Sequence, residues 1–366
     1  AANRDALQFI VGKERQLRTG WRPERIAGAA GAVERLRALL ANAKGGIGGT
    51  QIELVVYDDQ GAPKEAVPAA TKLVEKDRVV AAVSGSYSGS TRAAASIFQA
   101  GKVPYVVAYA IHPEITLAGD YMFRVSAMGE VQGRAGAKLA NDLGKKKVVI
   151  VTIKNDFGQS LAAGFKEAAP KFGLQIQAEY EYNLQDRQFG PLASKIRADN
   201  PDIIYASGYF YTAGPLVSQL RSAGITAPII GQEGYDSDKF IEIAGPASEG
   251  TYVTTSLDRD STNPATVSFI ADYKKSYNVG PDMVAASSFT AVAVTIEGLR
   301  KTGGKGGDVL RDALAGLTFD SPIGKLAFKI QDARLGHTLS RDNVRRDENF
   351  TRALQMVRTL AEDELP

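Results

Sequence analysis

A short segment rich in serine and glycine has residue types that can bind an anion. Residues 85–91 read Gly-Ser-Tyr-Ser-Gly-Ser-Thr and lie between an apolar run that ends at Val83 and a predicted helix over Arg92–Ala100. A turn that leads from a strand into a helix presents unpaired backbone N–H groups and hydroxyls at the positive end of the helix dipole. The segment therefore predicts a carboxylate-binding turn. The alternative is that Ser88 or Ser90 caps the amides of its own helix.

A single carboxylate between glycines follows a second apolar run. Glu233 lies in Gly-Gln-Glu-Gly-Tyr, residues 231–235, directly after the predicted strand Pro228–Ile230. Ligands of open α/β sheets bind beyond the carboxyl ends of the strands. Glu233 could pair there with an ammonium group, and the alternative is an acid on a solvent-facing loop.

Aromatic side chains follow three of the predicted strands. They are Tyr205, Tyr209, Phe210 and Tyr211 after one strand, Phe157 after another and Tyr109 after a third. Aromatic walls with a few polar groups suit a small organic ligand, although each ring taken singly also fits core or interface packing.

Motifs for catalysis and for metal binding are scarce. The two histidines, His112 and His337, are far apart in the chain, cysteine is absent, and neither a Gly-x-Ser-x-Gly elbow nor a His-Glu-x-x-His pair occurs. The run Gly45–Gly49 lacks the lysine and hydroxyl of a phosphate loop and predicts a turn. We expect no catalytic residues, no metal and no cofactor. An α/β enzyme that uses carboxylates remains the alternative.

Charge and cysteine content narrow the partners and the compartment. The 44 basic and 41 acidic side chains leave a net charge of +3, so no broad field exists to hold a nucleic acid. The absence of cysteine fits an oxidising compartment. No apolar run approaches the roughly 20 residues that span a bilayer. We expect an exported chain whose signal peptide is absent, because small residues like Ala1 and Ala2 flank signal cleavage sites.

Short β-branched runs alternate with segments of helical period, which is typical of an α/β protein with parallel strands. The candidate strands are Leu7–Val11, Ile52–Tyr57, Val79–Val83, Tyr105–Val107, Val148–Ile153, Ile176–Tyr180, Ile203–Ala206, Pro228–Ile230 and Tyr252–Thr254. The clearest helical segments are Glu24–Ala43, Pro264–Tyr277 and Val284–Thr302.

The strand-helix pattern occurs twice and indicates two similar lobes. One series ends near Val107 and the other extends from Val148 to Ile230, while Tyr121–Val125 and Thr251–Thr255 are expected to cross between them. The chain then returns to the first lobe. We assign residues 1–123 plus 254–326 to lobe 1 and residues 124–253 plus 327–366 to lobe 2.

From Gly45 to Phe328 the sequence resembles the branched-chain amino-acid-binding branch of the type I periplasmic binding proteins, the receptors of ABC importers. The matching residues are Asn42–Gly49, Tyr57-Asp58-Asp59, Ser88–Thr91, Pro113–Thr116, Phe123-Arg124, Asp156-Phe157-Gly158, Gly208-Tyr209 and Gly231–Gly234. The resemblance implies two Rossmann-like lobes with parallel central sheets, joined by a three-segment hinge. The segments before about residue 40 and from Lys329 onward depart from the family pattern.

The resemblance also implies a ligand site divided between the lobes. The ligand's carboxylate would meet Ser88, its neighbour Tyr87 and the backbone of Tyr109, Ala110 and Ile111. Tyr209 and Glu233 would hold the ammonium, and Phe157 would cover the ligand. Ile111 stands where relatives often carry a hydroxyl, and Trp21 could line the pocket from the first loop.

The function that the resemblance implies is capture of a small amino acid, branched-chain or otherwise aliphatic, with hinge closure and delivery to a membrane ABC permease. Such a protein would be periplasmic, monomeric and not an enzyme. Ile111 and the many tyrosines leave open an aromatic or aliphatic carboxylic acid, an amide or a urea as the ligand.

Overall fold

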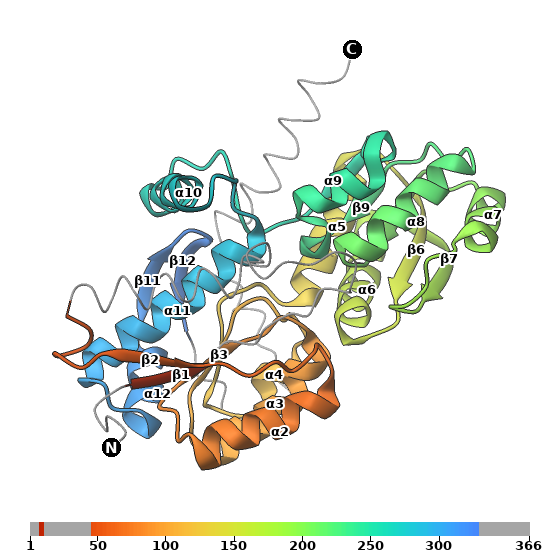
Figure 1. Cartoon of the computed structure of the whole chain (residues 1–366). Helices are drawn as coiled ribbons and strands as arrows, with labels where there is room; N and C mark the ends of the chain where they lie inside the picture. The colour runs from red at the N-terminus through yellow and green to blue at the C-terminus, as the bar shows by residue number, and fades with distance from the viewer. Residues whose placement is uncertain (1–6, 11–44, 329–366) are drawn as a thin grey trace. The chain divides into compact units, whose positions relative to one another are not determined.

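The computed structural model describes residues 7–10 and 45–328, and these form two compact units (Figure 1). Described residues up to Ser126 and from Ser261 onward make unit 1, and Ala127–Asp260 make unit 2. The divisions therefore lie at 126/127 and 260/261, compared with the expected 123/124 and 253/254. A third division was expected at 326/327, but the described residues 327 and 328 belong to unit 1. The predicted helix Glu24–Ala43 lies outside the described residues.

Unit 2 is built on a five-stranded, wholly parallel sheet, drawn in yellow to green in Figure 1. The strand order is β10-β9-β8-β6-β7. The strands are β6 (Lys147–Ile153), β7 (Gln175–Tyr182), β8 (Ile203–Ala206), β9 (Ile229–Gly231) and β10 (Thr251–Val253). All of β6 after Lys147 is buried, as expected for a parallel strand covered on both faces.

The helices of unit 2 pack closely where glycines meet. They are α5 (Gly129–Asp142), α6 (Asp156–Ala168), α7 (Gly190–Asp199), α8 (Phe210–Ser222) and α9 (Asp238–Ala244). A Cβ atom on Gly133 of α5 would lie 2.1 Å from the carbonyl oxygen of Leu161 on α6. A side chain at this position would therefore force the two helices apart.

Unit 1 has two groups of parallel strands and one antiparallel hairpin. The strands are β1 (Leu7–Ile10) paired with β2 (Ile52–Val55), then β3 (Ala82–Ser84), β4 (Tyr105–Val107) and β5 (Met122–Arg124), and the hairpin β11 (Thr318–Ser321) with β12 (Gly324–Ala327). The helices are α2 (Pro63–Thr71), α3 (Ser88–Ala100), α4 (Glu114–Leu117), α10 (Pro264–Tyr277), α11 (Met283–Thr302) and α12 (Gly307–Ala315), with a π-helical turn at Lys72–Lys76.

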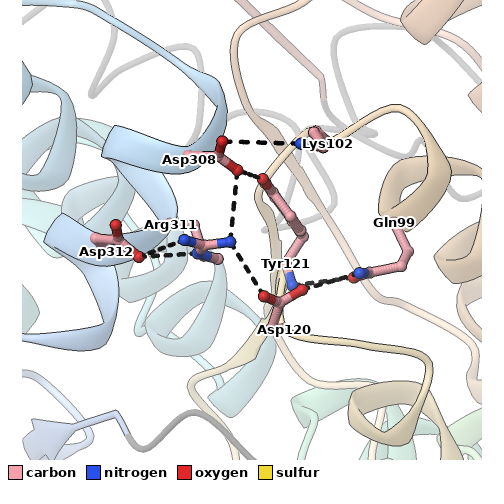
Figure 2. Close-up of polar contacts among 7 residues, drawn as sticks. All are labelled: Gln99, Lys102, Asp120, Tyr121, Asp308, Arg311 and Asp312. Atoms are coloured by element: carbon pink, nitrogen blue, oxygen red, sulfur yellow. Dashed lines mark hydrogen bonds and ion pairs between the residues drawn. The ribbon is translucent and has the colours of Figure 1, made fainter. Parts of the chain in front are cut away.

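The returning part of the chain is joined to the first part of unit 1 by apolar and polar contacts. Helix α11 packs against β3 and β4. Figure 2 shows the polar contacts: Tyr121 donates to Asp308 of α12, and Arg311 of α12 pairs with Asp120 at 3.1 Å. Two distant stretches of sequence therefore form one unit.

The two segments expected to cross between lobes are partly strands of single units. Met122–Arg124 is β5, which pairs with β4 in unit 1, and Thr251–Val253 is β10, which pairs with β9 in unit 2. The predicted strands Tyr105–Val107 and Ile203–Ala206 and the predicted helix Pro264–Tyr277 have the observed ends. In the part of the chain that the structure describes, no helix is long and apolar enough to cross a membrane.

Candidate ligand-binding site

Ser88 is the first residue of α3, and its hydroxyl bridges two backbone amides of another segment. Its Oγ accepts hydrogen bonds from the N–H groups of Ile111 and His112, each at 3.3 Å, and the residue is 2% exposed. A serine hydroxyl has one donor and two acceptor lone pairs. Because both acceptor positions are used, the O–H remains to donate, and an ionised carboxylate is its strongest acceptor.

The alternative in which Ser88 simply caps its own helix is wrong, because its Oγ accepts from two amides of another segment. Helix α3 begins at Ser88, four residues before the predicted start at Arg92, and its N-cap residue Tyr87 makes no side-chain cap. Ser90 Oγ donates to the carbonyl oxygen of Tyr87 at 3.3 Å. The Ser88 hydroxyl therefore serves a contact other than capping of its own helix.

Arg124, the last residue of β5, holds the segment after β4 in place. Its guanidinium donates to the carbonyl oxygens of Ala110 at 3.3 Å and His112 at 2.8 Å, and to Thr116 Oγ1 at 2.9 Å. Ala110 and Ile111 are buried, at 1% and 0% exposed. Arg124 thus holds the carbonyl groups of Ala110 and His112, while the Ile111 N–H donates to Ser88. Together these hydrogen bonds fix the orientation of the peptide groups in this segment.

The serine-rich turn itself is held against the segment after β4. The Tyr109 hydroxyl donates to Ser86 Oγ at 2.8 Å. Gly85 has φ of +115°, and a Cβ atom there would lie 2.6 Å from Val107 Cγ1, so a glycine is required for this close approach. Unit 1 thus brings together Tyr87, Ser88, Tyr109, Ala110 and Ile111 as a set of hydroxyls and amides.

Glu233 opens a 3₁₀ turn after β9 in unit 2 and is almost fully buried. The residue is 4% exposed, and its Oε2 accepts a hydrogen bond from Gln132 Nε2 at 2.9 Å. Burial raises the pKa of Glu233 to about 7, although hydrogen bonds from Ser256 and Gln132 act in the opposite direction. The alternative of a solvent-facing loop acid is therefore wrong. A buried carboxylate with a raised pKa becomes fully charged when a cation approaches it.

Phe157 and Tyr209 lie next to the Glu233 turn. Their rings stack with centroids 4.9 Å apart and an interplanar angle of 23°. A Cβ atom on Gly234 would lie 2.1 Å from the Gly208 carbonyl oxygen and 3.3 Å from Phe157 Cζ. Unit 2 therefore brings Phe157, Tyr209 and Glu233 together, beside an aromatic surface that continues to Tyr211, whose ring centroid is 5.6 Å from that of Tyr209.

Other sequence candidates lie elsewhere. Tyr205 of β8 is 1% exposed, stacks on Phe165 with centroids 4.4 Å apart and has a pKa raised by burial, so it is a core residue. Trp21 lies outside the described residues. Among the residues that the structure describes, no group of three or more histidine, aspartate or glutamate side chains could hold a metal ion.

Sequence reasoning missed Gln132 and gave Arg124 no role. Gln132 stands between Val131 and Gly133 in α5, and this local sequence does not indicate that its amide has a specific partner. Arg124 was part of the family resemblance, but the three acceptors that it joins are 8 to 14 residues away in sequence. Neither contact could be inferred from local pattern.

Comparison with known proteins gives consistent matches. Residues 19–341 match the family model described as periplasmic binding protein. A Pseudomonas aeruginosa leucine-, isoleucine-, valine-, threonine- and alanine-binding protein is 32% identical over 307 residues, covering 82% of this chain and 80% of the relative.

Two solved structures are similar over nearly the whole chain. A leucine binding protein from Thermotoga maritima superposes with a TM-score of 0.80 at 25% identity, covering 88% of this chain and 91% of that one. A branched-chain amino acid transporter substrate binding protein from Streptococcus pneumoniae, in complex with isoleucine, gives 0.79 at 26% identity with the same coverages. The expected type I fold is confirmed, and the chain belongs to the periplasmic binding protein family.

Proposed function

We propose that this chain is the periplasmic substrate-binding component of an ABC importer and that its ligand is a small aliphatic amino acid, in the first place leucine, isoleucine or valine. The observation that carries the proposal is Glu233, a buried carboxylate beside Tyr209 and Phe157. An ammonium group would offset the cost of burying its charge. The ligand class is supported by the similar proteins, which include a leucine-, isoleucine-, valine-, threonine- and alanine-binding protein and a structure in complex with isoleucine.

In this proposal the two ends of a zwitterion bind to different units. Ser88 and the amides of the segment after β4 receive the carboxylate, with Tyr87 and Tyr109 at the same turn, and Tyr209 and Glu233 receive the ammonium. Each charge-assisted hydrogen bond contributes about 1.5–3 kcal/mol. Two or three of them, with burial of an aliphatic side chain, give roughly micromolar affinity or better.

The proposed mechanism is hinge closure without chemistry. The ligand binds one unit first, the second unit closes on it, and a membrane permease recognises the liganded form of the monomer. No covalent step is required of any residue, so the ligand should leave unchanged. Mass spectrometry of the released ligand after long incubation checks this expectation, and a converted product would support an enzyme instead.

A thermal-shift panel tests the ligand class. The panel contains L-leucine, L-isoleucine, L-valine, L-alanine, 4-methylpentanoate, benzoate and urea. A ligand at 100 times its Kd adds about 2.7 kcal/mol to the free energy of unfolding. Because 1 kcal/mol shifts the Tm of a unit of 150–250 residues by roughly 2–4 °C, the expected rise in Tm is roughly 5–11 °C. We expect the branched-chain amino acids to do so. Stabilisation by 4-methylpentanoate or benzoate but by no amino acid would show that a carboxylic acid is the ligand.

A further inference from the structure

A buried glutamine joins the Glu233 carboxylate to the segment by which the chain enters unit 2. Gln132 lies in the first turn of α5 and is 2% exposed. Its Nε2 donates to Glu233 Oε2 at 2.9 Å and to the carbonyl oxygen of Ala127 at 3.3 Å. Two residues 101 positions apart in sequence thus share a hydrogen bond inside the unit.

The orientation of the Gln132 amide is determined by its two acceptors. Both partners of the amide are oxygen atoms, a carboxylate and a carbonyl, and only the NH₂ end of the amide can donate to them. The reversed amide would place its oxygen against two other oxygens. The NH₂ group is therefore held toward Glu233.

The hydrogen-bond donor that Gln132 offers to Glu233 is uncharged, and this matters because of the charges nearby. Asp236, a negative neighbour, raises the pKa of Glu233, and Asp236 itself is bound by Arg259 and by Thr255 Oγ1, each at 2.6 Å. An arginine or lysine in place of Gln132 would neutralise Glu233 within the protein. A glutamine orients the carboxylate and leaves its negative charge to be balanced by a ligand.

We infer that Gln132 is a positioning residue that orients the Glu233 carboxylate and favours its charged form for a cationic group of the ligand. The inference rests on the proposed function only for the identity of that group, the ammonium of an amino acid. The contact between Gln132 and Glu233 can be tested without any ligand.

The first test is the titration of Glu233 in the ligand-free full chain, followed by the NMR signal of its side-chain carboxyl carbon and assigned with Glu233→Gln. Gln132→Met removes the donor at nearly constant size, and we expect the pKa of Glu233 to rise by about one pH unit. Gln132→Lys should instead lower it below the wild-type value, so the inference remains testable if one variant does not fold. An unchanged titration in either folded variant overturns the inference.

Gln219→Met is the matched control. Gln219 of α8 also bridges backbone groups of unit 2, since its Oε1 accepts from the Phe189 N–H at 2.6 Å and its Nε2 donates to the Arg187 carbonyl at 2.8 Å. These hydrogen bonds hold the 187–189 segment and not Glu233, so the loss of Gln219 should reduce stability and leave the Glu233 titration unchanged. A shift of equal size in this control would mean that general loosening, and not the Gln132 contact, moves the pKa.

The second test separates the inference from the proposed function by calorimetric titration with L-leucine and with 4-methylpentanoate, which lacks the amine. A rise of one unit in the pKa of Glu233 lowers its ionised fraction at pH 7 about fivefold, and the difference nearly vanishes by pH 9. Gln132→Met should lower the affinity for leucine about fivefold at pH 7, and this affinity should return toward the wild-type value at pH 9. The affinity for 4-methylpentanoate should be unchanged. If the titration moves and leucine affinity does not, Gln132 still positions Glu233, and the assignment of Glu233 to the ammonium fails.

Discussion

Glu233 is a carboxyl group that destabilises the free protein in its charged form. Its pKa in the folded chain is about 7, whereas an unperturbed glutamate titrates near 4.3. Below about pH 4.3, the pKa of Glu233 in the unfolded chain, both the folded and the unfolded states hold the proton. Between about pH 4.3 and pH 7, only the folded state keeps it. The stability associated with the protonated form is therefore present at low pH and is lost as the pH rises through 7.

Glu233→Gln should raise the free energy of unfolding of the ligand-free protein at pH 8, where the wild-type group is charged and buried. The gain should be up to about 3 kcal/mol at pH 8 and close to zero at pH 4.5. Denaturant titrations of both proteins at the two pH values measure the difference. A pH-independent difference would show that the pKa of Glu233 is not raised in the folded chain. The same variant should lose most of its affinity for leucine, because the buried charge that lowers the stability of the free protein is the group proposed to bind the ammonium.

Ser88→Ala should weaken every ligand that carries a carboxylate, whether or not it carries an amine. The substitution removes the O–H donor and also leaves the amides of Ile111 and His112 without their acceptor. Loss of one charge-assisted hydrogen bond weakens binding by roughly 10- to 100-fold. Calorimetry with L-leucine and 4-methylpentanoate should show similar losses for both.

Ser90→Ala is the control for that substitution. Ser90 belongs to the same helical turn and is equally buried at 1% exposed, but its hydroxyl donates to the Tyr87 carbonyl. Its removal should leave both affinities within about twofold of wild type. A loss confined to leucine in Ser88→Ala would contradict the assignment of Ser88 to the carboxylate.

Helix α12 allows apolar packing to be compared with exposed ion pairs in a single element. Leu310 and Leu314 are fully buried, and a Cβ atom on Gly298 of α11 would lie 2.7 Å from Leu314 Cδ2. Leu310→Ala should cost about 2–5 kcal/mol because it leaves a cavity. Denaturant unfolding measures the loss.

The polar contacts on the same helix should contribute much less. Arg311 pairs with Asp120, but the two side chains remain 22% and 37% exposed (Figure 2). Exposed ion pairs contribute about 0–1 kcal/mol, so Arg311→Met should be nearly neutral. A loss from Arg311→Met that exceeds the loss from Leu310→Ala would show that the polar network, and not the leucines, holds the helix in place.

Elements with a strong local pattern could be predicted from the sequence, and those with a weak one could not. Tyr105–Val107 is a fully buried β-branched and aromatic run, and its ends were predicted as observed. The predicted start of α3 was wrong because Ser88, Gly89 and Ser90 have low helix propensity. The hydrogen bonds between Ser88 and the segment after β4 could not be inferred from any local sequence pattern.

The candidate site could be predicted only in part for a similar reason. Ser88 and Glu233 stand in recognisable turns after strands, and the structure places each one near the side chains expected for its own unit. Gln132 is on a helix 101 residues before Glu233, and no periodicity connects them. The two parts of the proposed site also belong to different units, so their joint use remains a prediction.

The proposed division of the site between the two units predicts a motion of one unit relative to the other when the ligand binds. Unit 1 is formed by two separate stretches of chain and unit 2 by the one between them, so the described chain passes from one unit to the other at 126/127 and back at 260/261. A ligand whose two charges bind to different units can stabilise only arrangements in which both units reach it. It raises the population of those arrangements by an amount set by the difference between its affinities for them and for the other arrangements.

Leucine should therefore change the distance between labels on the two units. The chain has no cysteine, so Lys64→Cys in unit 1 and Lys195→Cys in unit 2, both exposed, give a uniquely spin-labelled pair. Saturating leucine should shift and narrow the distance distribution measured by pulsed electron paramagnetic resonance. The same leucine concentration should leave the distribution unchanged in the Glu233→Gln background, because that variant lacks the acceptor for the ammonium. A leucine-saturated wild-type pair with an unaltered distribution would mean that the ligand binds within one unit, and the proposal of a zwitterion held between the two would then fail.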